Sequence, residues 1–173
     1  MPINFDITIK SKKWLNFNND LNSAKKDIKE ICTDIIALCP IQKLKPKKNN
    51  IEISLILMSD LQIKKINNKY RQKDYPTNTL SFPIFDKIEL EALNFNSKLS
   101  DIFLGDLLFS YEKIAKESKL QNKNFKNHLT HLILHSILHI LGFDHDDDLN
   151  TKEMENLEIK ILKKLKIPNP YIN

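Results

Sequence analysis

Residues 124 to 145 read NFKNHLTHLILHSILHILGFDH, and this stretch holds the most informative pattern in the chain. We predict a long helix over residues 124–141, with Gly142 supplying the turn that ends it. All five histidines of the protein lie between His128 and His145. Random placement would rarely gather them in this way, so the stretch is a candidate site as well as a helix.

Three of these histidines have the spacing of metal ligands. His135 and His139 are four residues apart, which on a helix places both on one face about 6 Å apart along the axis. Because Gly142 ends the helix, His145 can offer a third imidazole from another direction. Three neutral imidazoles and a water are the ligand set of a catalytic zinc site, whereas a structural site needs a fourth protein ligand. The alternative is that the helical histidines are hydrogen-bonded polar residues of a core helix.

The polar residues near these histidines have weaker predicted roles. His131 lies one turn before His135, where we expect it to orient a ligand or line the cleft. His128 is expected to face solvent. Asp144 and residues 146–148 could accept hydrogen bonds around the ligands, although an acidic loop and a helix start explain them more simply.

The pattern HxxxHxxGxxH also occurs in metzincin proteases, where a glutamate after the first histidine acts as general base. Ser136 occupies that position here. A serine cannot accept a proton at neutral pH, so protease chemistry by this route lacks its base, which must come from elsewhere or from the substrate. The residue serving as base is unassigned.

The remaining elements are predicted outward from this helix. Strands are predicted over residues 3–9, 51–58, 79–85 and 102–109, the third ending early or lying at a sheet edge because it contains Pro83. The other helices are predicted over residues 20–39, 59–70, 110–120 and 151–166. Loops are expected over residues 43–50, 71–78 and 86–101, the last with room for a helical turn. This order predicts an α+β fold, a small mixed sheet of about four strands covered by about five helices, with a zincin-like metal-binding helix.

Composition limits the classes of protein that remain. The 173 residues suit a single domain over 1–173, and 41% hydrophobic with 28% charged residues predicts a folded chain. Gly105 and Gly142 are the only glycines, which excludes a dinucleotide fingerprint and a P-loop. Gly105 falls inside a predicted strand and marks a bulge or a close backbone approach.

Cysteine usage and hydropathy predict a cytoplasmic protein with no membrane association. Cys32 and Cys39 are too few for a four-cysteine zinc site and are expected to be buried free thiols on a helix. The first residues lack the pattern of a secretion signal, and no apolar run approaches the ~18 residues of a membrane span.

Charge is unevenly distributed along the chain. The net charge is +5, but residues 1–75 hold 15 basic and 8 acidic side chains, 15 − 8 = +7. Such a basic half suits a polyanion such as RNA, although lysine-rich faces are often only solvated surface. Arg71 is the sole arginine among 27 basic residues, which favours a role for its planar fork in binding two oxygens at once.

Two further motifs link this arginine to the histidines. Residues 70–83 read YRQKDYPTNTLSFP and residues 104–106 read LGD. Together with the histidine string they resemble the YbeY family, bacterial rRNA-maturation endoribonucleases, whose pattern is approximately YRxKDxPTxVLSFP, LGD and HGxLHLxGYDH. The resemblance runs in order from about residue 51 to residue 145. Departures are Ser136 for glycine, Phe143 for tyrosine and Thr79 for valine, and the larger serine could alter cleft width or activity.

The resemblance implies a function and its residues. It implies His135, His139 and His145 as metal ligands, Arg71 as the residue that engages RNA phosphate near the metal, and roles in processing the 3′ end of small-subunit rRNA and in ribosome quality control. We therefore predict a single-strand-specific, zinc-dependent endoribonuclease in which the metal acts as Lewis acid or generates hydroxide. One Zn²⁺ per chain is expected, with manganese, nickel or iron as other candidates. Expected partners are rRNA and the ribosome or its small-subunit proteins.

Two other functions stay open at this point. A metallopeptidase or amidohydrolase would use the same ligands, but the missing glutamate and the basic first half argue against it. A ribosome-assembly factor could hold a mainly structural metal. Cleavage of purified RNA with and without a chelator separates these possibilities.

Overall fold

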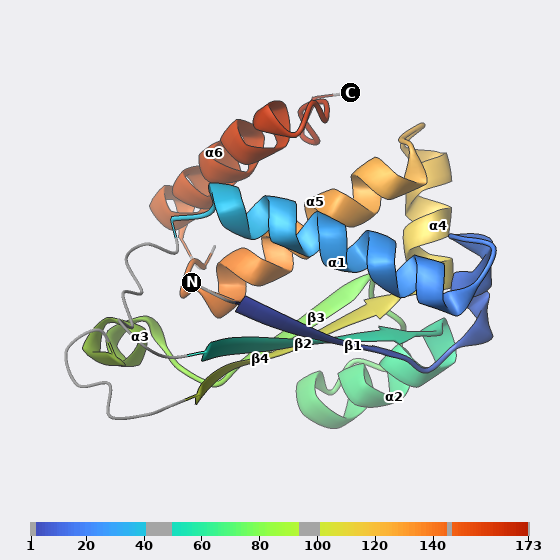
Figure 1. Cartoon of the computed structure of the whole chain (residues 1–173), viewed down its shortest axis with the longest axis horizontal. Helices are drawn as coiled ribbons and strands as arrows, with labels where there is room; N and C mark the ends of the chain where they lie inside the picture. The colour runs from blue at the N-terminus through green and yellow to red at the C-terminus, as the bar shows by residue number, and fades with distance from the viewer. Residues whose placement is uncertain (1–2, 41–49, 94–100, 145–146, 173) are drawn as a thin grey trace.

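One four-stranded sheet forms the centre of the computed structural model, which describes residues 3–40, 50–93, 101–144 and 147–172 (Figure 1). Its strands are β1 (Ile3–Ile9), β2 (Asn50–Met58), β3 (Thr79–Pro83) and β4 (Asp101–Ser110), in the spatial order β1-β2-β4-β3. β1, β2 and β4 are parallel, and β3 is antiparallel at one edge. The predicted α+β class and mixed sheet are confirmed.

Helices cover both faces of this sheet. They are α1 (Leu21–Leu38), α2 (Asp60–Arg71), α3 (Lys87–Leu93), α4 (Tyr111–Leu120), α5 (Phe125–Ile140) and α6 (Asp148–Lys164), with a short 3-10 helix η1 (Lys12–Asn16). α1 and α5 lie on one face and α2 on the other, while α6 packs beside α5 (Figure 1). Within the described residues, no helix is long and apolar enough to cross a membrane.

At the start of α1, α2 and α6, polar side chains cap the first turn of the helix by hydrogen bonding to backbone amides. The Asp20 carboxylate accepts hydrogen bonds from two amides at the start of α1, and Asp147 does the same for α6. Ser59 and Gln62 form a capping box at α2. Each such cap stabilises its helix by about 0.5–2 kcal/mol. α6 therefore starts at Asp148, three residues before the predicted start.

The larger core lies between the sheet and the α1/α5 layer. Alternate residues of β2 are fully buried there, as its period of two requires, and they are Ile51, Ile53, Leu55 and Leu57. Each burial contributes roughly 1.5–3 kcal/mol. A smaller cluster under α2 contains Met58, Ile63, Leu80 and Leu108. Cys32 and Cys39 are buried free thiols, as predicted, and burial raises the pKa of Cys39 to about 12.

Gly105 produces a bulge in β4. The β2/β4 register shifts at this point, because Phe103 pairs with Glu52 and Gly105 with the next residue, Ile53, which leaves Leu104 as an extra residue in β4. Such an extra residue interrupts the alternation of side chains between the two faces of the sheet. Leu104 at the bulge and Leu107 after it consequently belong to the same core cluster. Gly105 has φ +146°, and a Cβ there would lie 2.2 Å from the Phe82 carbonyl oxygen and 2.7 Å from Ile140 Cδ1. Both predicted features, bulge and close approach, are confirmed.

Some predicted boundaries are wrong. Residues 87–93 form α3, a longer helix than the single turn expected within the predicted 86–101 loop. The Asp86 and Glu89 side chains cap it, because each accepts a hydrogen bond from the other residue's backbone amide. The described residues therefore hold six α-helices where about five were expected. β3 ends at Pro83, before residue 85, and lies at the edge of the sheet, so the early end and edge position expected from Pro83 are confirmed. The Ser110 hydroxyl donates to Asp60 instead of capping α4, and most of the predicted 43–50 loop lies outside the described residues.

Candidate functional site

Two of the three predicted metal ligands face each other on α5. The Nε2 atoms of His135 and His139 are 3.2 Å apart, and their rings are nearly perpendicular at 87°. For zinc–nitrogen bonds of about 2.0–2.1 Å, two ligands of a tetrahedral site lie roughly 3.3–3.4 Å apart. The two imidazoles thus have the separation that one shared ion requires. His145 lies outside the described residues, and within those residues no group of three metal-ligating side chains occurs.

Gly142 ends α5 directly after this pair, as predicted. Its φ is +82°, and its amide donates to the His139 carbonyl at 3.0 Å, while Phe143 N donates to the Leu138 carbonyl at 3.0 Å. A Cβ at Gly142 would lie 3.2 Å from Lys87 Cα. Glycine therefore permits both the left-handed turn and the close packing of α3 beside the histidines.

Glu158 on α6 is a site residue that the sequence prediction missed. Its side chain is fully buried, and its carboxylate accepts hydrogen bonds from His135 Nδ1 at 2.8 Å and from His131 Nε2 at 3.0 Å. The hydroxyl of Tyr171 donates to the same carboxylate. Burial alone would raise the pKa of Glu158, but these three donors outweigh it and lower the pKa to about 2. The carboxylate is therefore ionised at neutral pH.

The other polar neighbours only partly follow their predicted roles. His131 is hydrogen-bonded to Glu158, and Glu158 is hydrogen-bonded to His135. His131 is therefore linked to the predicted ligand His135 through Glu158. Asp144 Oδ1 is 3.8 Å from His139 Nδ1 and is half exposed. The prediction that His128 faces solvent is wrong. Its side chain is 5% exposed, and its Nε2 lies 3.2 Å from Glu117 Oε2.

A cleft of about 710 Å³ joins the histidines to the second sequence motif. Arg71, the last residue of α2, lines this cleft together with His135 and His139. Residues 77–81 form another wall, and Lys87 of α3 adds a second cation. The lone arginine and the histidine string, 64 positions apart by 135 − 71, thus share one concave surface.

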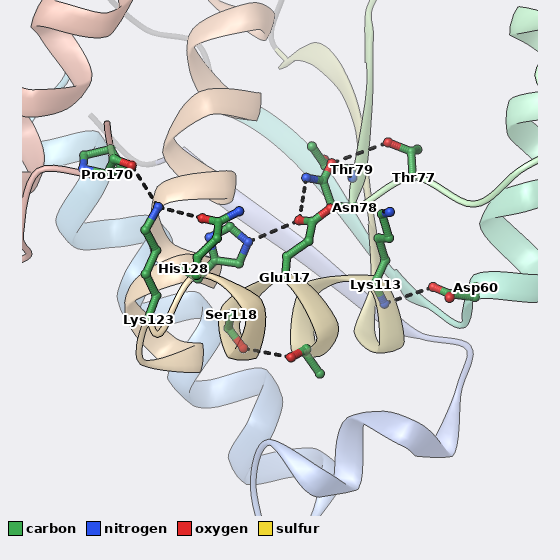
Figure 2. A network of polar contacts seen from close by, with 12 residues as sticks. Asp60, Thr77, Asn78, Thr79, Lys113, Glu117, Ser118, Lys123, His128 and Pro170 are labelled. Carbon is green, nitrogen blue, oxygen red and sulfur yellow. Dashed lines mark hydrogen bonds and ion pairs between the residues drawn. The ribbon is translucent and has the colours of Figure 1, made fainter. Parts of the chain in front are cut away.

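Glu117 fixes the wall formed by residues 77–81. Its Oε2 accepts a hydrogen bond from Asn78 Nδ2 at 2.9 Å and lies beside His128, so that one carboxylate links α4, α5 and the start of β3 (Figure 2). Asn78 Oδ1 accepts from Thr79 N at 2.7 Å. Burial would raise the pKa of Glu117, but the hydrogen bonds from His128 and Asn78 lower it. The polar wall is therefore held by the partly buried carboxylate of Glu117 as well as by the sheet.

Two departures from the resembled sequence pattern contact each other. Thr79 Oγ1 and Ser136 Oγ are 2.8 Å apart, within hydrogen-bond distance. Ser136 is fully buried beside His135, and Thr79 is half buried on β3. This hydroxyl pair ties the cleft wall directly to the histidine helix.

Comparison with known proteins finds relatives over most of the chain. A family model described as Endoribonuclease YbeY matches residues 13–166. Endoribonuclease YbeY of Francisella philomiragia is 39% identical over 150 residues, covering 85% of this chain and 86% of that protein. The Bartonella bacilliformis protein of the same description is 34% identical over 169 residues, covering 98% and 97%. A solution structure from Thermotoga maritima aligns over 99% of both chains, with 18% identity and a TM-score of 0.47.

The family model and the two relatives place the chain among the endoribonucleases. The chain belongs to the YbeY family.

Proposed function

We propose that this protein is a zinc-dependent endoribonuclease that cuts single-stranded RNA during maturation of the 3′ end of small-subunit rRNA. The observation that carries the proposal is the common cleft of Arg71, His135 and His139. Family membership supports the reaction class. Action in ribosome quality control and contact with small-subunit proteins are further parts of the proposal, supported by the sequence resemblance. Function as one domain over residues 1–173 is also part of it, supported by the length of the chain.

His135, His139 and His145 would hold the metal. The 3.2 Å separation between the two Nε2 atoms on α5 supports this assignment, and imidazole nitrogens suit zinc among the divalent metals. When bound, the ion supplies Lewis-acid polarisation of a phosphoryl oxygen or lowers the pKa of a water.

Arg71 would bind the phosphate from the opposite wall of the cleft. Its guanidinium lies at the exposed end of α2, where Gln72 with φ 57° ends the helix. Two parallel N–H groups of a guanidinium can donate to two non-bridging oxygens, whereas a lysine acts as a single point charge. Lys87, which lies beside Gly142 at the end of the histidine helix, lines the same cleft and adds a second positive charge to it.

Replacing His139 with alanine tests the ligand assignment. Loss of one of three imidazoles should remove most bound metal and abolish RNA cleavage. Metal per chain is measured by elemental analysis of protein purified without added metal, and cleavage of a single-stranded RNA is measured with and without chelator. If metal content and cleavage both survive in the variant, the assignment is wrong. If wild type holds metal but its cleavage resists complete metal removal, the metal is structural.

Replacing Arg71 with lysine tests whether the arginine acts on phosphate. The charge remains but the fork is lost, so single-turnover cleavage should slow by roughly 10² to 10³, as for loss of one transition-state donor. Arg71→Ala should be slower still. Exposed Lys73, two residues further along the chain, gives a matched control in Lys73→Ala, which should cleave normally. Equal rates for wild type and both Arg71 variants at unchanged Tm would contradict the phosphate role.

A further inference from the structure

Glu158 occupies an unusual position for a glutamate. It lies on α6 among apolar inward residues, is 0% exposed, and is surrounded by His131, His135 and Tyr171. Removing an ionised carboxylate from water costs several kcal/mol, and a well-packed apolar residue would avoid that cost. The network is therefore poorly explained as a simple stabilising contact between α5 and α6.

The hydrogen bonds of Glu158 dictate which nitrogen of His135 carries the proton. A carboxylate only accepts hydrogen bonds, so His135 must donate from Nδ1 to Glu158 Oε1. A neutral imidazole with its proton on Nδ1 has its lone pair on Nε2. That Nε2 atom is the one lying 3.2 Å from His139 Nε2. The ring is thus prepared to coordinate on the side of the cleft.

The second oxygen of Glu158 is held separately. Oε2 accepts from His131 Nε2 and from the Tyr171 hydroxyl, so Oε1 is directed at His135. The Tyr171 ring also packs edge-on to His131, with centroids 5.6 Å apart. Residues from two places in the chain, α5 and the segment after α6, therefore converge on one carboxylate of α6.

We propose that Glu158 is a positioning residue that fixes the Nδ1–H tautomer and the ring orientation of His135, and that Tyr171 and His131 hold Glu158 in place. The inference deepens the proposed function, on whose metal site it rests. Partners of this kind raise metal affinity without touching the metal, and their loss typically weakens binding by about 10- to 100-fold.

Glu158→Gln and Tyr171→Phe test the proposal in the full-length protein. Tyr171 is 44% exposed, so its variant should fold normally. Glu153→Gln is the matched control, because Glu153 is an exposed glutamate on the same helix. Zinc affinity is measured by competition with a chromophoric chelator. We expect about 10- to 100-fold weaker binding for Glu158→Gln, about tenfold for Tyr171→Phe and no change for the control.

A second readout separates positioning from stability. Long-range proton–nitrogen correlation spectra of the metal-free protein report which ring nitrogen of each histidine is protonated. Wild type should show His135 with Nδ1–H, and Glu158→Gln should give a mixture of tautomers. A lower Tm with unchanged tautomer and unchanged zinc affinity would overturn the proposal.

Two further outcomes also test the proposal. If Glu158→Gln does not fold, Tyr171→Phe carries the test, and unaltered zinc affinity in that variant would refute the proposed network. If wild type binds no zinc, the proposed metal site fails. The tautomer of His135 in metal-free wild type and Tyr171→Phe then still shows whether the network positions that ring.

Discussion

The hydroxyl pair of Thr79 and Ser136 allows a prediction of energetic coupling across the cleft. In Thr79→Val the fully buried Ser136 hydroxyl loses its partner, which costs about 1–3 kcal/mol. Ser136→Ala should cost less, about 0.5–1 kcal/mol, because half-buried Thr79 can bond to water and alanine favours the helix. The double variant leaves no hydroxyl without a partner and should be nearly neutral. The sum of the two single effects should therefore exceed the double effect by about 1.5–4 kcal/mol.

Urea unfolding of the four proteins measures this coupling. Thr33→Val is a control for loss of a threonine hydroxyl, because Thr33 is exposed on α1 and its hydroxyl bonds only the Lys29 carbonyl within the same helix. We expect it to change the free energy of unfolding by less than about 0.5 kcal/mol. Strict additivity of Thr79→Val and Ser136→Ala would refute the reasoning, since it would mean that the two hydroxyls do not interact in solution.

Two more predictions concern the core. Gly105→Ala should lower the free energy of unfolding by about 2–4 kcal/mol, combining backbone strain at φ +146° with the clash against the Phe82 carbonyl, and a thermal melt within 2 °C of wild type would contradict this. Cys39 should react with a thiol reagent roughly 10³-fold more slowly at pH 8 than a free cysteine, because burial raises its pKa to about 12 and so depletes the thiolate. The rate should rise about tenfold per pH unit, and fast labelling of the native protein would show that the thiol is accessible.

The parts of the fold that depend on local patterns were predictable from the sequence. The 3–9 strand matches β1, and the 20–39 helix differs from α1 by one residue at each end, because a buried face imposes a regular period on both. α3 has no such stripe, since Leu90 is buried while Ile88 is 78% exposed. Its one local signal was the Asp86 and Glu89 capping pair.

The candidate site was predictable only where its residues stand close in sequence. His135 and His139 belong to one helix, so their spacing alone placed them on one face. Glu158 was missed because a glutamate is almost never fully buried, and its burial depends on how α6 packs on α5. His128 was misplaced for the same reason, since its partner Glu117 comes from α4. The signal that could have identified Glu158 was a charged residue four positions after buried Met154 and three before buried Ile161.

The hydrophobic core on the α1/α5 face of the sheet is larger than the core on the α2 face. α5 is buried against the larger cluster, whereas α2 rests on Met58, Ile63, Leu80 and Leu108. Units with few buried apolar contacts open at lower free energy than the rest of a protein. We therefore expect α2, which ends at Arg71, to open at a lower free energy than α5, which carries the imidazole pair. Backbone amides of α2, on one side of the cleft, should consequently exchange their hydrogens faster than those of α5.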